Sequence, residues 1–206
     1  MAKKTGAQKT GLWRLLPAVA IAAAAAGCNV AYKTDVMRRD VLSDAQQVIA
    51  DARINHGDLT ITAAADRSDT TYAPGQPITL SVKTSKDAHV AILRVLPSGD
   101  TALVFPNRAH RDAAVAANAV TSVPAPGDKI KIAADKPGVV LFEVIAATAG
   151  TSWLFTRAPD DGSDFASLGV TTRDIAKDLL STLKVGGAAP TAATHLTVRI
   201  GGGGLL

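Results

Sequence analysis

Cysteine is almost absent from this sequence, because Cys28 is the only one in 206 residues. A single thiol cannot form a disulfide bond within the chain, which excludes a small fold held together by disulfides. An exported protein in an oxidising compartment also avoids an unpaired thiol unless another reaction consumes it. The position of Cys28, directly after the run "AAAAAG", therefore needs an explanation.

Net charge is lacking from most of the chain. The whole sequence has a formal charge of +4 and a pI near 9.3, which alone would favour nucleic acid or an anionic membrane as a partner. The excess precedes Cys28, however, and comes from Lys3, Lys4, Lys9 and Arg14. Without these four of the 22 Lys and Arg residues, 18 basic groups face 18 acidic ones. Phosphate binding needs a basic patch, so no nucleic-acid partner is expected.

Long hydrophobic runs are lacking as well. The longest, residues 15–26, falls well short of the ~20 apolar residues that a membrane-spanning helix needs. It follows the cationic stretch "AKKTGAQKTGLWR" and precedes the small residues "AGC". These three zones are typical of an export signal. A buried core helix and an ordinary secretory peptide cut within residues 22–26 are the alternatives.

The end of this signal resembles a bacterial lipobox. Small residues occupy the three positions before the cysteine, Ala25, Ala26 and Gly27, although leucine is commonest where Ala25 stands. The resemblance implies that the sulfur of Cys28 receives a diacylglycerol, that the chain is cut before Cys28, and that the new amine is acylated. In similar enterobacterial lipoproteins an aspartate after the cysteine retains the protein in the inner membrane. Asn29 stands there instead, which favours the outer membrane.

Three acyl chains on one residue would hold the protein on a membrane, since each buried methylene contributes ~0.8 kcal/mol and one chain alone binds only marginally. The expected location is therefore the bacterial cell envelope, as an outer-membrane lipoprotein whose domain faces the periplasm or the exterior. Residues 28–56 are predicted to be a tether. A short helix is expected within it, because Ser43 and Gln46 have the spacing of a capping box.

Beyond residue 56 short β-branched segments with a period of two alternate with Pro, Gly and Asp, which is typical of an all-β sandwich. "APGQ" at 73–76 predicts a type II turn, and "PSGD" at 97–100 predicts a hairpin turn. The seven candidate strands are "DLTITAA", "PITLSVK", "HVAILRVL", "TALVF", "KIKIAA", "GVVLFEVIA" and "HLTVRI". The eight-residue "HVAILRVL" is apolar on both faces and is expected to be central.

One late helix is predicted after Thr171, which has capping-box spacing to Asp174. Its apolar stripe comprises Ile175, Leu179, Leu180 and Leu183. The expected fold class is thus mainly β, an immunoglobulin-like or Greek-key antiparallel β-sandwich with one late α-helix. The expected organisation is a signal peptide at 1–27, the tether at 28–56, the sandwich domain at 57–200 and a disordered tail at 201–206.

Catalytic and metal-binding patterns are missing. "HRD" at 110–112 with Asn118 imitates a kinase catalytic loop, but five residues separate Asp and Asn where that motif has four. "DDGSD" at 160–164 lacks the alternate spacing and the distal glutamate of a calcium loop. The histidines have no metal-ligand spacing, and no G-x-S-x-G elbow occurs. No catalytic residue, metal, cofactor or small-molecule substrate is therefore expected, and the chain is not predicted to be an enzyme.

The turns and strands of residues 57–200 resemble the bacterial domain of unknown function numbered 4384. That family shows a Tyr-x-Pro-Gly turn, an Asp-centred turn, a Gly turn and a Phe-Pro-Asn close. The matching residues here are Tyr72, Pro74, Gly75, Asp87, Gly99, Phe105, Pro106 and Asn107. Family members occur on envelope lipoproteins and beside caspase-like proteases and protein kinases, so the resemblance implies an accessory or recognition role without an activity.

Three function classes follow. The first is a lipid-anchored envelope domain that binds a protein or cell-wall partner. The second is a docking lipoprotein of a secretion machine, because outer-membrane lipoproteins of type VI systems have a similar size and a transthyretin-like sandwich. The third is a cell-wall hydrolase, which the missing catalytic residues disfavour.

The stretch 107–126 is the candidate binding loop, because it is longer than a hairpin loop and long loops on a rigid scaffold often carry recognition. Its expected exposed handles are Arg108, His110, Arg111 and Asp112. A poorly ordered excursion and a hidden edge strand in "AVTSVP" are the alternatives.

Overall fold

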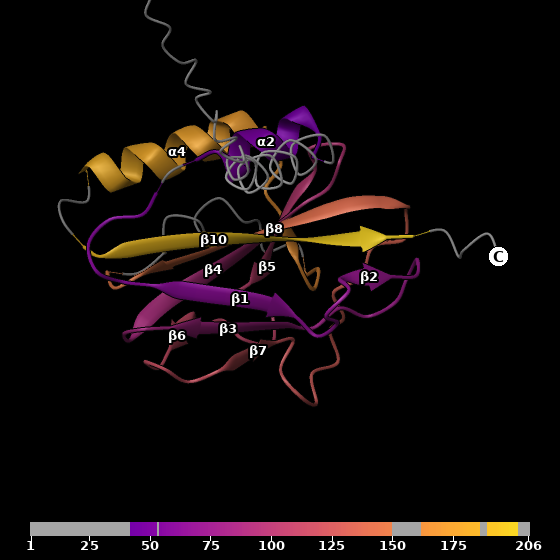
Figure 1. The fold of residues 1–206 in the computed structure, drawn as a ribbon, viewed down its shortest axis with the longest axis horizontal. Coiled ribbons are helices and arrows are strands. Elements are labelled where there is room, and N and C mark those ends of the chain that lie inside the picture. The colour runs from indigo at the N-terminus through magenta and orange to yellow at the C-terminus, as the bar shows by residue number, and fades with distance from the viewer. Residues whose placement is uncertain (1–41, 53, 150–161, 186–188, 202–206) are drawn as a thin grey trace, which may run out of the picture. The chain divides into compact units, whose positions relative to one another are not determined.

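Two packed β-sheets and a layer of helices make up the part of the chain that the computed structural model describes, residues 42–52, 54–149, 162–185 and 189–201 (Figure 1). The smaller sheet has the order β1 (Ile61–Ala65), β3 (Leu80–Thr84), β7 (Thr121–Val123). The larger has the order β2 (Thr71–Tyr72), β10 (Thr191–Ile200), β8 (Gly138–Ala147), β4 (Ala88–Val95), β5 (Thr101–Phe105), β9 (Ala166–Ser167), while β6 (Ala114–Val115) pairs with the start of β4. All pairs are antiparallel except β2 with β10. The prediction of a mainly β sandwich with a late helix is confirmed.

The larger sheet is buried on both faces. On β8, Val140, Phe142 and Val144 face the smaller sheet and belong to the main core. Because side chains alternate along a strand, Leu141 and Ile145 point the other way and join a second apolar cluster, which includes residues of the helices. This two-sided burial explains why β8 and the central β4 are almost continuously apolar.

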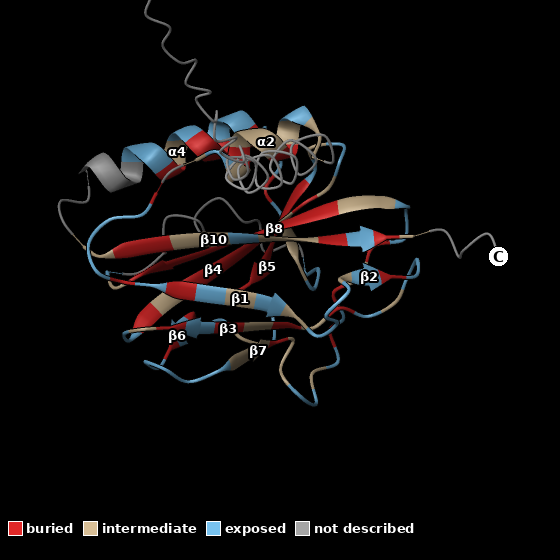
Figure 2. Cartoon of the chain, in the orientation of Figure 1, coloured by how far each residue is buried: buried red, intermediate tan, exposed pale blue. Residues whose placement is uncertain are grey.

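The helices α2 (Asp44–Ala50) and α4 (Thr172–Val185) cover the second face of the larger sheet, and we call them the helical layer. Figure 2 shows buried residues on the sides turned to the sheet and exposed ones on the outer sides. Ile175 and Leu179 of the predicted stripe are buried, whereas Leu180 is 38 % exposed. Including Leu180 in the stripe was therefore wrong, and the side chain of Leu183 is outside the described residues.

The short helix predicted near Ser43 is present and is closed by a capping box with Gln46. It does not belong to a free tether, because Ile49 and Ile54 are buried in the second apolar cluster. The physical reason is that "VIADARI" presents an apolar face too large to leave in water. The folded domain therefore includes residues 44–56, and the predicted boundary at 57 comes too late. The predicted signal at 1–27 and residues 202–206 lie outside the described part.

Six predicted strands and both predicted turns are present. Gly75 in "APGQ" has a φ of 73° and Gln76 N donates to Ala73 O, while Leu96 N donates to Asp100 O across "PSGD". The prediction of a seventh strand in "KIKIAA" is wrong, since this segment forms only an isolated bridge between Ile132 and Ile78. Its partner follows Pro77, which has no N–H group to extend the ladder.

Candidate functional site

The stretch 107–126 contains two short strands that the sequence did not separate. β6 pairs with β4, and β7 pairs with β3, so the hidden edge strand considered in "AVTSVP" is the correct alternative. The segment begins in an ordered turn, where Asn107 Oδ1 accepts from Ala109 N and His110 N, and Asn107 Nδ2 donates to Val104 O. Of the four expected handles, Arg108 and His110 lie within this turn, and Arg111 and Asp112 follow it.

Three of the four handles have partners within the domain. Arg108 Nη1 donates to Gly162 O at 2.7 Å, and Asp112 Oδ1 accepts from Ala114 N at 2.9 Å. His110 Nε2 lies 2.9 Å from Asp128 Oδ2. Arg111 is exposed and also makes a contact of its own. These side chains therefore support the conformation of the segment, and replacing all four would disturb it.

The His110–Asp128 pair links the predicted loop to a shallow pocket of ≈ 250 Å³. Asp128 is well placed to hold the pocket wall, since its Oδ2 also accepts from Ala125 N at 2.8 Å. We call this pocket the β7 groove, and its lining residues are Pro77, Ile78, Thr79, Ser122, Pro124, Ala125, Pro126, Asp128, Ile130, Lys131 and Ile132. Prolines and isoleucines make up more than half of these lining residues, which gives the groove an apolar floor.

The β7 groove adjoins an outer sheet edge, and Lys131 lines it, with Lys129 two residues earlier in the chain; we call these two lysines the basic rim. β7 is the last strand of the smaller sheet, so its outer edge has no paired strand among the described residues. Val120, just before β7, is 66 % exposed. Lys129 and Lys131 are exposed and form no ion pair within the described part of the chain. An open strand edge, an apolar floor and two cations suit an extended, acidic peptide segment.

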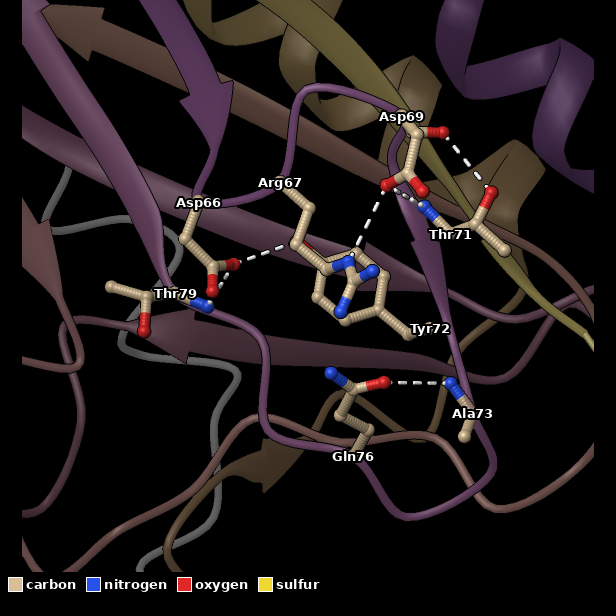
Figure 3. A network of polar contacts seen from close by, with 8 residues as sticks. All are labelled: Asp66, Arg67, Asp69, Thr71, Tyr72, Ala73, Gln76 and Thr79. Carbon is tan, nitrogen blue, oxygen red and sulfur yellow. Dashed lines mark hydrogen bonds and ion pairs between the residues drawn. The ribbon is translucent and has the colours of Figure 1, made fainter.

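The Tyr-x-Pro-Gly motif has a structural role, which its tyrosine provides. Tyr72 is buried, its hydroxyl donates to Asp66 Oδ1 at 2.6 Å, and the guanidinium of Arg67 lies 5.7 Å from the centre of its ring (Figure 3). Burial, followed by the hydrogen bond to Asp66, raises the pKa of Tyr72 to about 12. Burial opposes ionisation of Asp66, but hydrogen bonds from Tyr72 and from Thr79 N outweigh it and lower the pKa of that carboxyl. The network joins the β1–β2 connection to the start of β3.

Sequence reasoning missed Glu143, the only glutamate in the chain. It lies in the middle of β8, is 3 % exposed, and its Oε2 atom has no hydrogen-bond partner among the described residues. Burial raises the pKa of Glu143 from 4.5 to about 8. The available signal was a single acidic residue inside the apolar run "GVVLFEVIA", which is unusual for a strand buried on both faces.

The other residues considered for chemistry stand apart. His56 bridges to Thr191, His89 lies on β4 and His195 lies on β10. Of "DDGSD", residues 162–164 are exposed and the two preceding residues are outside the described part. Within the described residues no group of three or more His, Cys, Asp or Glu side chains could hold a metal ion. The lipobox residues Ala25, Ala26, Gly27 and Cys28 also lie outside the described part.

The comparison with protein families bears on the centre of this domain. Residues 71–149 match the family model described as a domain of unknown function, DUF4384. The DUF4384 range runs from β2 through β8 and contains Tyr72, the β7 groove and Glu143. No curated protein and no solved structure matches the chain. Among the described residues, no helix has the length and apolar character needed to cross a bilayer.

Proposed function

We propose that this chain is a lipid-anchored protein of the bacterial envelope and that its β-sandwich is a non-catalytic binding domain. The observation that carries the proposal is the single cysteine, Cys28, placed after a cationic zone, an apolar zone and three small residues. Acylation would consume the only thiol in the chain. Asn29 favours the outer membrane as the site of anchoring.

Replacement of Cys28 by alanine should abolish lipid attachment, because alanine has no sulfur to receive the diacylglycerol. The variant should accumulate as an uncleaved or soluble exported protein. Metabolic labelling with an alkyne-tagged fatty acid measures the effect, and the labelled band should disappear. Cys28→Ser is a second variant for the same test, since it also lacks the thiol but keeps a similar size. Equal labelling of wild type and both variants would refute the anchor.

We further infer that the binding partner is an extended acidic segment of another envelope protein or of a secretion complex, held at the β7 groove. The edge of β7 offers backbone hydrogen-bonding groups to an added strand. The groove offers an apolar floor beside that edge, and Lys129 and Lys131 attract acidic side chains. The identity of the protein that cross-links to the groove distinguishes a secretion-machine partner from other envelope partners.

The groove can be tested with a photo-crosslinking amino acid at Ser122, which lines the pocket. In cells, the double variant Lys129→Glu and Lys131→Glu should reduce the cross-linked product at least fivefold, because it reverses the charge of the rim. The matched control is Arg173→Glu with Lys177→Glu, two exposed cations on α4. The control should retain full cross-linking. Equal losses in both double variants, or none in either, would contradict the proposed site.

A further inference from the structure

Glu143 sits between the larger sheet and the helical layer. Leu141 and Ile145, two residues before and after it on β8, both belong to the cluster that contains Ile175 and Leu179 of α4. Side chains two residues apart on a strand share a face, so Glu143 also faces the helices. Its carboxyl therefore lies in the interface between two layers, the larger sheet and the helices.

No described group forms a hydrogen bond or ion pair with the Oε2 atom of Glu143. On its sheet face the directly opposite residues are Leu93 on β4 and His195 on β10. His195 is exposed, and Arg94 on β4 points to the opposite face. α4 contributes Asp178, whose Oδ2 is also buried, and α2 contributes the uncharged Gln46 at the far end of β8. The α4 side chain with a buried ionisable atom is thus itself acidic and would not stabilise a carboxylate.

Water can reach this carboxyl from one direction. The opposite face of β8 packs against the smaller sheet through Phe142 and Val144, and both neighbouring strands are hydrogen-bonded along its length. Among the described residues no hydrogen-bonded ladder joins the helical layer to the sheet. The contacts described between them are apolar packing and the hydrogen bonds of Gln46 to Val95 O and Val139 O. Hydration of Glu143 therefore requires the helices to move before the strands separate.

We propose that Glu143 controls the attachment of the helical layer: the neutral carboxyl keeps α4 on the sheet, and loss of its proton to water releases α4. The released proton is the only chemical change, and no other reactant takes part. Because burial raises the pKa of Glu143 to about 8 from an ordinary 4.5, release of α4 becomes easier with each pH unit up to about pH 8 and changes no further above it. Opening uncovers an apolar sheet surface that includes Leu93, Leu141 and Ile145. The device requires neither the lipid anchor nor a binding partner.

Hydrogen exchange of the full chain, read by mass spectrometry at pH 6, 7, 8 and 9, tests this device. After correction for the intrinsic pH dependence of amide exchange, the amides of α4 should exchange at least tenfold faster at pH 9 than at pH 6. The amides of β4 and β8 should keep their protection. Binding of the dye ANS should rise over the same pH interval, since the uncovered surface is apolar.

The variant Glu143→Gln should abolish both changes, and Glu143→Leu provides a second variant without an ionisable group. His195→Gln and Asp178→Asn remove the ionisable side chain opposite Glu143 and the buried acid of α4, and both variants should retain the change up to pH 8. The proposal is overturned if Glu143→Gln keeps the change, if either control variant abolishes it, or if the sheet amides lose protection together with those of α4.

Discussion

Replacing Glu143 by glutamine should stabilise the domain by about 3 kcal/mol at pH 7, because a buried carboxyl with a raised pKa opposes folding wherever the unfolded chain is ionised. The pKa is about 8 in the folded state, against an ordinary value of 4.5. Below 4.5 both states bind the proton and the wild-type chain has no penalty. Between 4.5 and 8 folding takes up a proton, so wild-type stability falls by about 1.4 kcal/mol per pH unit. Above pH 8 the wild-type stability falls no further for this reason.

Urea unfolding of wild type and Glu143→Gln at pH 4.5, 7 and 9 measures this effect. The difference in the free energy of unfolding should be small at pH 4.5 and should grow to about 5 kcal/mol at pH 9. Asp164→Asn is a suitable control, since it removes an exposed carboxyl and should leave the pH dependence of wild type intact. A difference between wild type and Glu143→Gln that is the same at all three pH values would contradict the raised pKa.

Replacing Gln46 by leucine should destabilise the domain by about 2–4 kcal/mol, because one buried and one partly buried carbonyl group lose their donor. Gln46 is 0 % exposed, and its Nε2 donates to Val95 O at 2.9 Å and to Val139 O at 2.8 Å. Its Oε1 accepts from Ser43 N at 3.0 Å, which completes the capping box of α2. One side chain therefore joins the first helix to two neighbouring strands of the larger sheet.

The adjacent Gln47 provides a matched control for this prediction. Its Nε2 donates only to the exposed Asp51 at 3.1 Å, so Gln47→Leu should change the free energy of unfolding by less than ~0.5 kcal/mol. Chemical unfolding at pH 4.5, where the ionisation of Glu143 contributes little, separates the two effects. If Gln46→Leu proves as mild as Gln47→Leu, then α2 contributes little to the folded domain, and residues 44–56 act as the tether that the sequence suggested.

Periodicity in the sequence predicted the strands whose apolar positions determine their burial. "PITLSVK" alternates and forms β3, while "HVAILRVL" is apolar on both faces and forms the central β4. "KIKIAA" alternates equally well, but strand formation also depends on the partner, and Pro77 limits that partner. The short β6 and β7 carry too few residues for a periodic signal, and their pairing with β4 and β3 depends on chain segments far away in the sequence.

In the candidate site, too, some features could be predicted from local sequence and others depend on contacts made only in the fold. The exposure of Arg108 and Arg111 could be predicted from local polarity, and both are exposed. The partner of His110 could not, because Asp128 is eighteen residues away and meets it only after the chain has turned. Likewise the β7 groove combines residues before β3 with residues after β7. Burial of Glu143 depends on α4, which follows it in the chain and covers its face only in the folded domain.

The position of β10 determines when this domain can finish folding. β10 follows every other strand in the chain, yet it lies inside the larger sheet and pairs with β8 from Thr191 opposite Ala147 to Ile200 opposite Gly138. A chain that emerges from a ribosome or a translocation pore with its N-terminus first therefore exposes one whole edge of β8 until residue 200 has followed. The domain must stay unfolded for most of that passage, so the chain can still move through a narrow pore. The incomplete sheet is meanwhile a target for chaperones.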